Sequence, residues 1–279
     1  MEEKQRQYKD KWAVVLGCSS GIGAATVRAL VRDHGINIFA MHRGNYQDEA
    51  DKLANDVRAM DAKIHIVKAD AGIPEGVEQG IAELHAVAGD NNVSFFVHSI
   101  ANASHGRFTG DKSFHPKQFA KTFESMAHSF VYWANWLVAR DLLSPGAMLL
   151  GLTNPLMDSI INEFGMVSAA KAALDVYIRH LALEMGPLGY RVNLLKFGLV
   201  ETPAVKEMTG EENWRGIKKR VSAVTPAGRI SSLEEVADFI SLLMQPAANF
   251  FNGATIDFTG GQVQSLVGHV FDPTKIINA

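Results

Sequence analysis

The sequence predicts an α/β fold in which helices cover both faces of one seven-stranded parallel sheet. Three observations lead to this class. Short apolar runs alternate with longer helical patterns, these runs are almost continuously apolar, and a glycine-rich turn separates the first run from the first helical pattern. Continuously apolar strands are typical of parallel sheets buried on both faces, and right-handed crossovers between them give a single doubly wound, Rossmann-type fold.

Seven apolar runs, bounded by polar or turn-forming residues, are predicted to be the strands. They are Trp12–Leu16, Ile36–Met41, Lys63–Lys68, Val93–His98, Ala147–Leu152, Arg191–Lys196 and Ala254–Phe258. The helices predicted between them are Ile22–Asp33, Gln47–Met60, Pro74–Ala88, Pro116–Leu143, Asn162–Met185 and Leu233–Met244. Because we find no internal repeat, low-complexity stretch or Pro/Gly-rich linker, we expect residues 1–279 to form one domain.

Two segments depart from this alternation. Residues 199–222 follow the sixth predicted strand and are mixed in character and partly helical. A loop at that place lies over the carboxyl edge of a parallel sheet, so we expect it to act as a substrate lid. Residues 262–279 extend past the last strand. An oligomer contact is the use that we expect for this C-terminal extension.

The composition restricts the classes of function. The chain of 279 residues is 47% hydrophobic with net charge −3, so it can form a large core and gives no reason to expect a nucleic-acid partner. Its one cysteine, Cys18, excludes a disulfide framework and suits a reducing compartment. No apolar run approaches 18 residues and Met1–Lys11 has no signal-peptide pattern, so we expect a cytoplasmic protein without a membrane span. We assign no metal ligands.

The turn after the first strand has the features of a dinucleotide-binding turn. Its sequence over residues 17–23 is GCSSGIG. Three glycines allow a tight turn and a close approach of phosphate, and the following helix offers free N–H groups and the positive end of its dipole. The turn residues assigned to the cofactor are Gly17, Ser19, Ser20, Gly21, Ile22 and Gly23. We interpret Cys18 as a small loop residue rather than a reactive thiol.

The end of the second strand indicates the choice of cofactor. It reads Met41-His42-Arg43-Gly44-Asn45, without the carboxylate that holds the ribose hydroxyls of NAD. Arg43 can meet a 2′-phosphate with a fork of donors. The sequence therefore favours NADP(H) over NAD(H), with His42 and Arg43 as candidate binding residues. The alternative is that Arg43 is an ordinary surface arginine.

Several motifs together resemble the short-chain dehydrogenase/reductase family. They are the glycine turn, Asp70 after the third strand, Arg191–Asn193 with Gly198 and Thr202, Thr225–Phe239 and Gly253–Gly261. Residues 98–101 read HSIA, which is similar to the enoyl-acyl-carrier-protein reductase branch rather than to the Asn-Asn-Ala-Gly of most members. The resemblance implies further cofactor contacts at Asp70, Ala71, Ser99, Ile100, Ala101, Lys171, Gly198, Val200 and Thr202.

The tyrosine of that family is missing from both of its usual positions. Ordinary members place it four residues before the catalytic lysine and enoyl reductases place it seven before, so either hydroxyl can share a helix face with the lysine. Relative to Lys171, these positions hold Val167 and Phe164, and the family's serine position falls at Thr153 or Asn154. The resemblance therefore implies Lys171, Phe164 and Asn154 as catalytic positions, in an enoyl-reductase frame without the tyrosine hydroxyl.

The implied reaction is hydride transfer from NADPH to the β-carbon of a small-molecule or carrier-bound enoyl thioester, in fatty acid or polyketide biosynthesis. Other groups that can supply the tyrosine's hydrogen bond are Tyr132, Thr153, Asn154, His98, a cofactor ribose hydroxyl and water. We interpret His98 as structural and exclude Tyr177, which faces away from Lys171 at helical spacing. The alternatives are a catalytically weak or inactive NADP-binding relative with a regulatory or assembly role, and a reductase of a carbonyl or another unusual substrate.

The two longest predicted helices, Pro116–Leu143 and Asn162–Met185, are apolar on more than one face. In the family that the chain resembles, the corresponding helices form a four-helix dimer interface, and a further contact near the last strand makes tetramers. The resemblance therefore implies a homodimer or a homotetramer.

Overall fold

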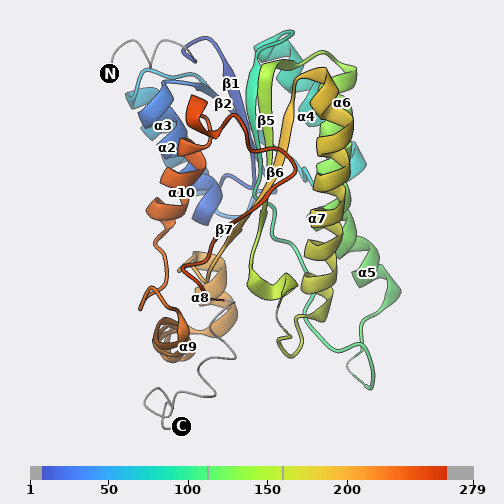
Figure 1. The fold of residues 1–279 in the computed structure, drawn as a ribbon, viewed down its shortest axis with the longest axis vertical. Coiled ribbons are helices and arrows are strands. Elements are labelled where there is room, and N and C mark those ends of the chain that lie inside the picture. Colours follow the sequence, from blue (N-terminus) through green and yellow to red (C-terminus); the bar gives the residue numbers. More distant parts are fainter. Residues whose placement is uncertain (1–7, 112, 159, 263–279) are drawn as a thin grey trace.

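The computed structural model describes residues 8–111, 113–158 and 160–262, and its centre is one parallel sheet. The strand order is β3-β2-β1-β4-β5-β6-β7, as the apolar runs predict for a doubly wound fold (Figure 1). The strands are β1 Trp12–Leu16, β2 Asn37–His42, β3 Ile64–Lys68, β4 Val93–His98, β5 Leu143–Thr153, β6 Arg191–Phe197 and β7 Thr255–Phe258. All six neighbouring pairs are parallel.

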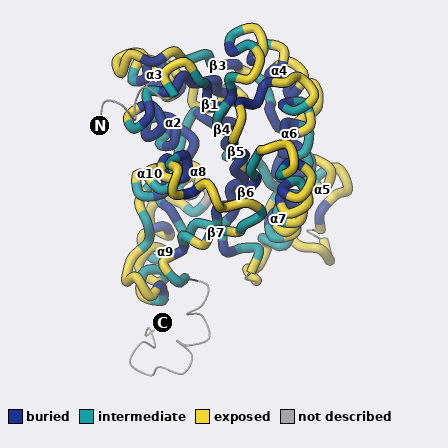
Figure 2. The backbone as a smooth tube through the Cα atoms, turned by 45° about the horizontal axis from the view of Figure 1, so that its top comes forward, coloured by how far each residue is buried: buried dark blue, intermediate teal, exposed yellow. Residues whose placement is uncertain are grey.

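Helices cover both faces of this sheet. The α-helices are α2 Gly21–His34, α3 Gln47–Ala59, α4 Pro74–Ala88, α5 Pro116–Phe123, α6 Ser129–Ala139, α7 Gly165–Met185, α8 Pro203–Thr209, α9 Glu211–Val224 and α10 Leu233–Leu242. Figure 1 shows α2, α3 and α10 on one face, and α4, α6 and α7 on the other. Figure 2 shows the central strands as a buried layer between helices that expose an outer side, whereas the edge strand β7 is exposed or partly buried. The predicted seven-stranded sheet with helices on both faces is confirmed.

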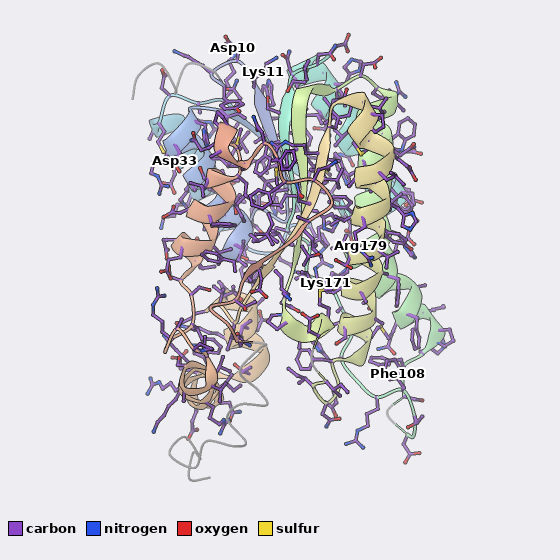
Figure 3. All side chains as sticks on the ribbon, viewed as in Figure 1. Asp10, Lys11, Asp33, Phe108, Lys171 and Arg179 are labelled. Atoms are coloured by element: carbon purple, nitrogen blue, oxygen red, sulfur yellow. The ribbon has the colours of Figure 1, made fainter. Side chains whose placement is uncertain are left out.

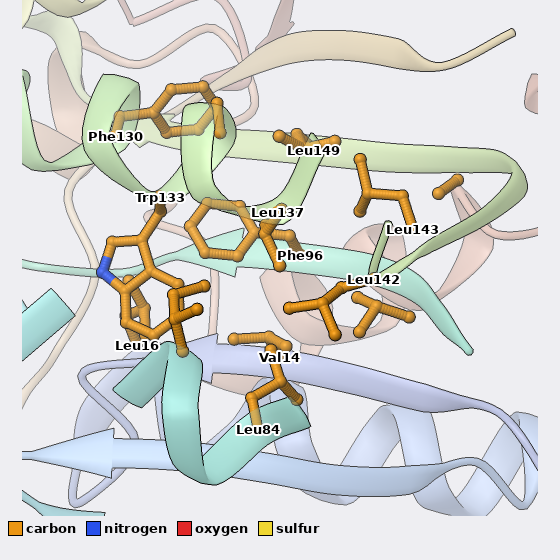
Figure 4. Close-up of a cluster of buried hydrophobic side chains, with 14 of the residues drawn as sticks. Val14, Leu16, Leu84, Phe96, Phe130, Trp133, Leu137, Leu142, Leu143 and Leu149 are labelled. Carbon is orange, nitrogen blue, oxygen red and sulfur yellow. The ribbon is translucent and has the colours of Figure 1, made fainter. Parts of the chain in front are cut away.

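Side chains from alternate strand positions build a hydrophobic layer on each face. Phe95 packs with α2, α3 and α10 residues, whereas its neighbour Phe96 packs with residues of α4 and α6. Trp133 of α6 fills the centre of the second layer, with its indole fully buried (Figure 4). Its Nε1–H donates to the carbonyl of Ala71 at 3.0 Å, so the largest side chain of the core also fixes the loop after β3.

The predicted helix Pro116–Leu143 is wrong at its end and in its middle. The helical segment ends at Ala139, and Leu143 begins β5, because Asp141 has a left-handed φ of 50° that ends the helix. A π-helical turn, η1 Glu124–His128, separates α5 from α6. The prediction joined helix α6 to strand β5 because apolar residues are buried on both sides of the short turn between them, at Leu137 and at Leu142.

The predicted helix Asn162–Met185 also starts too early. Its first residue is Gly165, and Phe164 is the residue that precedes it. Glu163 has a left-handed φ of 66°, which excludes it from a right-handed helix. Phe164 is therefore the N-cap residue of α7 and does not lie on the surface of the helix.

The segment predicted as a lid contains α8 and α9, and an isolated bridge between Val200 and Ser231 ties its beginning to the start of α10. Residues 263–279, which make up nearly all of the predicted C-terminal extension, and residues 1–7 of the charged N-terminus lie outside the described residues. Within the described part of the chain, the helices are too short or too polar to cross a membrane.

Candidate active site

The glycine turn follows β1, the strand at which the strand order of the sheet reverses. Strand β1 stands between β2 and β4, so the crossovers from β1 and from β4 leave in opposite directions and open a crevice at the carboxyl ends of the strands. Gly17 has a φ of 81°, and a Cβ there would collide with the carbonyl oxygen of Ser99. A Cβ on Gly23 would collide with the carbonyl oxygen of Gly17. The turn therefore requires glycine at both positions.

The first turn of α2 keeps its N–H groups available for an anion. Ser20, which precedes the helix, makes no side-chain cap, and the first turn contains no acidic residue. A Cβ on Gly21 would lie 3.5 Å from the methyl carbon of Thr202, so the loop after β6 lies beside the turn. Thr202 in turn caps α8 by accepting from the N–H of Val205 at 3.1 Å. Free N–H groups at the start of a helix, in a turn whose glycines allow a close approach, fit the diphosphate of a nucleotide cofactor.

The end of β2 presents one exposed cation. Arg43 is exposed, whereas His42 is buried and its Nδ1 accepts from the N–H of Gly44 at 3.2 Å. Burial lowers the pKa of His42, with smaller effects that include the nearby charge of Lys68, so His42 is neutral. Lys68 ends β3 directly beside His42 in the parallel register, and its side chain lies against Gly44.

The remaining candidate cofactor residues line the same carboxyl edge. Asp70 shapes the loop after β3 by accepting from the N–H of Gly72 at 3.0 Å. The N–H of Ser99 donates to Leu16 at 3.0 Å, which holds the end of β4 against β1. Of the other candidates, Ala71, Gly198 and Val200 are buried, Ile100 is partly buried and Ala101 is exposed.

Lys171 is buried on the side of α7 that faces the sheet. Its side chain is only 5% exposed, and its Nζ donates to the carbonyl oxygen of Leu152, near the end of β5, at 2.7 Å (Figure 3). Burial lowers the pKa of Lys171 to about 8, because the charged ammonium loses its hydration. The ammonium is thus fixed at the carboxyl edge by one backbone bond, with further N–H donors to give.

Phe164 lies in a small apolar group beside the start of α7. It packs with the cluster formed by Met126, Val167 and Ala170. The ring of His105 meets it edge-on, with centroids 4.7 Å apart. Phe164 offers shape and no hydrogen-bond donor from its side chain.

The polar groups nearest in sequence to the expected serine and tyrosine are already engaged. Thr153 is buried and its hydroxyl donates to the sulfur of Met157 at 3.5 Å. The side-chain oxygen of Asn154 accepts from the N–H of Leu156 at 3.2 Å and so caps a short 3₁₀ turn. Burial, together with a hydrogen bond to Glu124, raises the pKa of Tyr132.

His98 is held in one neutral form inside the protein. Ser129 donates its single hydroxyl hydrogen to the carbonyl of Ser125 at 2.8 Å, so at 2.8 Å His98 Nε2 is the donor to the Ser129 hydroxyl. Burial and, to a smaller extent, the charge of Lys171 lower the pKa of His98 to about 3. A fully buried neutral ring whose proton is committed to Ser129 acts as a structural link between β4 and α6.

Comparison with known proteins identifies the family. A family model described as Enoyl-(Acyl carrier protein) reductase matches residues 17–262. The chain belongs to this family of short-chain dehydrogenase/reductases.

Several proteins similar to this chain are reductases that match it over most of their length. The chain is 26% identical over 265 residues to 1-cyclohexenylcarbonyl-CoA reductase of Streptomyces collinus, covering 92% of this chain and 89% of that protein. It is 28% identical over 231 residues to the enoyl-[acyl-carrier-protein] reductase [NADH] FabI of Escherichia coli, covering 80% of this chain and 86% of the relative. Among solved structures, L-sorbose reductase of Gluconobacter frateurii complexed with NADPH and L-sorbose has the same fold, with a TM-score of 0.81, 24% identity and coverage of 92% and 97%.

Three polar residues of the enoyl reductase-like site were not indicated by the sequence. Lys68 adds a second cation beside His42 and Gly44, and the parallel pairing of β2 with β3 could have indicated it. Ser168 bonds back to the carbonyl of Phe164 at 3.2 Å. His105 lies in a segment without apolar periodicity, so no sequence signal pointed to its contact with Phe164.

Proposed function

We propose that this protein is an NADPH-dependent reductase of an activated alkene, with an enoyl thioester as its substrate. The observation that carries the proposal is the buried Lys171, fixed to the end of β5 at the edge where the glycine turn lies. A buried ammonium costs free energy, and a protein with no use for its charge could place an apolar residue there at no loss of packing.

The residues divide the work between holding the cofactor and shaping the reaction. The glycine turn and the start of α2 hold the diphosphate, and Lys171 holds the nicotinamide ribose and contributes positive charge. When bound, the cofactor supplies a hydride to the β-carbon of the thioester. Phe164 stands at the position of the family's tyrosine and bounds the pocket without a donor. Helices α8 and α9 form the lid over this edge.

NADP(H) is the proposed cofactor because Arg43 is exposed at the end of β2, and Met41–Asn45 contains no carboxylate that would repel a 2′-phosphate. Relatives differ in this choice, since the Escherichia coli reductase is named for NADH and the sorbose reductase was solved with NADPH. The site therefore has to be judged by its own charges.

Three further features belong to the proposal. The substrate is a small or carrier-bound acyl thioester, in keeping with relatives named for a CoA or an acyl-carrier-protein thioester. The protein acts in the cytoplasm as a homodimer or homotetramer. On α7, Val176 and Leu183 are 42% and 75% exposed, as expected for residues that a second copy covers. Light scattering of the purified protein would measure the assembly.

The function is tested by following NADPH absorbance with crotonyl-CoA and a longer enoyl thioester, first with the wild type and then with Phe164→Tyr. We expect measurable wild-type turnover, and turnover in the tyrosine variant that is at least as fast, because the tyrosine hydroxyl is an added donor for the oxyanion. A wild type that turns over neither thioester, beside an active Phe164→Tyr variant, contradicts the reductase function for these substrates.

A second candidate function is that of an NADP-binding protein without catalysis, in a regulatory or assembly role. The observation that favours it is the engagement of the other polar groups inside the protein, since the Thr153 hydroxyl donates to Met157 and the Asn154 side-chain oxygen accepts from Leu156. NADPH binding without turnover of any thioester, in both the wild type and Phe164→Tyr, would favour this role.

A further inference from the structure

We propose that the imidazole of His105 donates to the thioester oxygen the hydrogen bond that Phe164 lacks the hydroxyl to make. The proposal rests on the proposed enoyl thioester reduction. It assigns a catalytic role to a residue of the segment between β4 and α5, where the positions assigned above are the cofactor residues Ser99, Ile100 and Ala101.

The segment that carries His105 is attached to the start of α7 by three neighbouring contacts. The N–H of Gly106 donates to the carbonyl of Glu163 at 3.1 Å. Arg107 forms an ion pair with the same residue, with 3.8 Å between Nε and Oε1. The ring of Phe108 lies against Gly165, where a Cβ would collide with it. These contacts fix the backbone on both sides of Phe164, so the position of His105 relative to Phe164 is set by the fold.

The rings of His105 and Phe164 meet edge to face. Their centroids are 4.7 Å apart and their planes are inclined by 67°. A tyrosine hydroxyl at position 164 would project from the rim of this ring. Because the imidazole is in contact with the same ring, it lies near the place where that hydroxyl would be. Aromatic contact with Phe164 also orients the imidazole, which reduces the entropy lost when it binds an oxyanion.

His105 differs from the other polar candidates because its donors are available. Its side chain is exposed, and neither ring nitrogen has a hydrogen-bond partner among the described residues. By contrast, His98 gives its ring proton to Ser129 and the Thr153 hydroxyl donates to Met157, while the side-chain oxygen of Asn154 is tied to the N–H of Leu156 in a turn that begins ahead of Phe164. In either neutral tautomer an imidazole carries one N–H, which is sufficient for an oxyanion donor.

The chemical step balances with His105 unchanged at its end. A hydride from the reduced cofactor forms the new C–H bond at the β-carbon, and the π electrons of the alkene move toward the carbonyl to place negative charge on the thioester oxygen. The His105 N–H stabilises this charge by hydrogen bonding. The α-carbon then takes a proton from water, so enoyl thioester, NADPH and one proton give saturated thioester and NADP⁺.

The first test compares His105→Ala and His105→Gln with a matched control, His85→Ala. His85 is another exposed histidine, paired with Asp90 where α4 leads into β4, at the opposite edge of the sheet. With crotonyl-CoA, we expect kcat to fall about 10²-fold in His105→Ala, to fall less in His105→Gln, which keeps an N–H, and to be unchanged in the control. The Kd of NADPH, measured by fluorescence titration, should be unchanged in all three.

The second test is rescue. Phe164→Tyr in the His105→Ala background should restore most of the lost kcat, because the tyrosine hydroxyl supplies the same hydrogen bond from the neighbouring ring. If wild type turns over crotonyl-CoA and His105→Ala matches it, the role of His105 is refuted while the reductase function stands. If His105→Ala loses NADPH binding together with activity, the residue is structural and the proposal fails. Absence of wild-type turnover overturns the reductase function first, and the role of His105 with it.

Discussion

The β1–α2 side and the α7 side of the candidate site depend on different parts of the chain, the first on backbone and the second on side chains. On the β1–α2 side, backbone geometry does the binding, and Gly17 and Gly23 are fixed because any Cβ would collide with a carbonyl oxygen. On the α7 side, the proposed chemistry depends on side chains, and Phe164 differs from a tyrosine by one oxygen atom. A backbone cradle changes only with the fold, whereas a side-chain donor can be lost or moved without disturbing packing. The β1–α2 side is therefore the half that tolerates the fewest substitutions, and the α7 side is the half in which the reaction can change.

The largest effect should come from breaking the backbone side. Gly17→Ala places a Cβ against the carbonyl of Ser99 at a residue with a φ of 81°. We expect the free energy of unfolding to fall by about 3 kcal/mol or more and NADPH binding to be lost, since both strain and collision act on the turn. Thermal unfolding and a fluorescence titration with NADPH would measure the two losses.

Gly189→Ala is the matched control for that substitution. Gly189 also has a positive φ, 85°, in the left-handed region, but a Cβ there would meet nothing within 4 Å. We expect a loss of about 1 kcal/mol from backbone strain alone and unchanged NADPH affinity. Equal losses in the two variants would refute a special constraint at the glycine turn.

The next effect concerns the buried charge on the α7 side. Burial lowers the pKa of Lys171 from 10.5 to about 8 in the folded protein. Below pH 8 both folded and unfolded chains carry the proton, so the full desolvation penalty is present. Between pH 8 and 10.5 the unfolded chain binds more protons at this site, so the free energy of unfolding rises with pH. Relative to Lys171→Met, the wild type should gain roughly 3 kcal/mol across this window.

Urea unfolding of both proteins without cofactor, from pH 7 to 10.5, measures this difference, and other titrating groups cancel in the comparison. Parallel stability curves for wild type and Lys171→Met would mean that the lysine is hydrated. In the enzyme assay, we expect Lys171→Met to lower kcat with crotonyl-CoA about 10²-fold.

A smaller effect is expected where the cofactor side does use a side chain. Arg43→Ala should weaken NADPH binding about tenfold and leave NADH binding unchanged, because one charge-assisted contact to the 2′-phosphate is removed. Arg28→Ala, which removes a partly exposed arginine paired with Asp56, is the control. Titration of each variant with both cofactors gives the ratio, and an equal loss for NADPH and NADH would exclude recognition of the 2′-phosphate by Arg43.

The smallest effect is expected at Cys18. It lies within the glycine turn, where a helix dipole favours a thiolate, yet it is fully buried and burial raises its pKa to about 12. The folded protein should therefore react with a thiol reagent only as fast as it unfolds, and NADPH binding should be unaffected by brief exposure. Stoichiometric labelling of the native protein within seconds would contradict this.

The strands and the glycine turn were predictable because burial on both faces leaves apolar runs, and because tight turns restrict residue type. The π-helical turn was not, since its spacing depends on tertiary packing instead of local pattern. The left-handed Glu163 that puts Phe164 ahead of α7 was equally invisible. The inward orientation of His42 and the contact of His105 with Phe164 depend on which loops meet in space, and a single sequence does not contain that information.

The π-helical turn η1 makes chain length itself a functional constraint. On this turn Ser125 accepts from Asn102 at 3.1 Å, and immediately after it Ser129 accepts from His98. Deleting one residue would rotate everything on one side by about 100° and separate these two contacts. This stretch of helix should thus reject a single-residue deletion, because the end of β4 and the segment that follows it are held by residues within and just after the same turn.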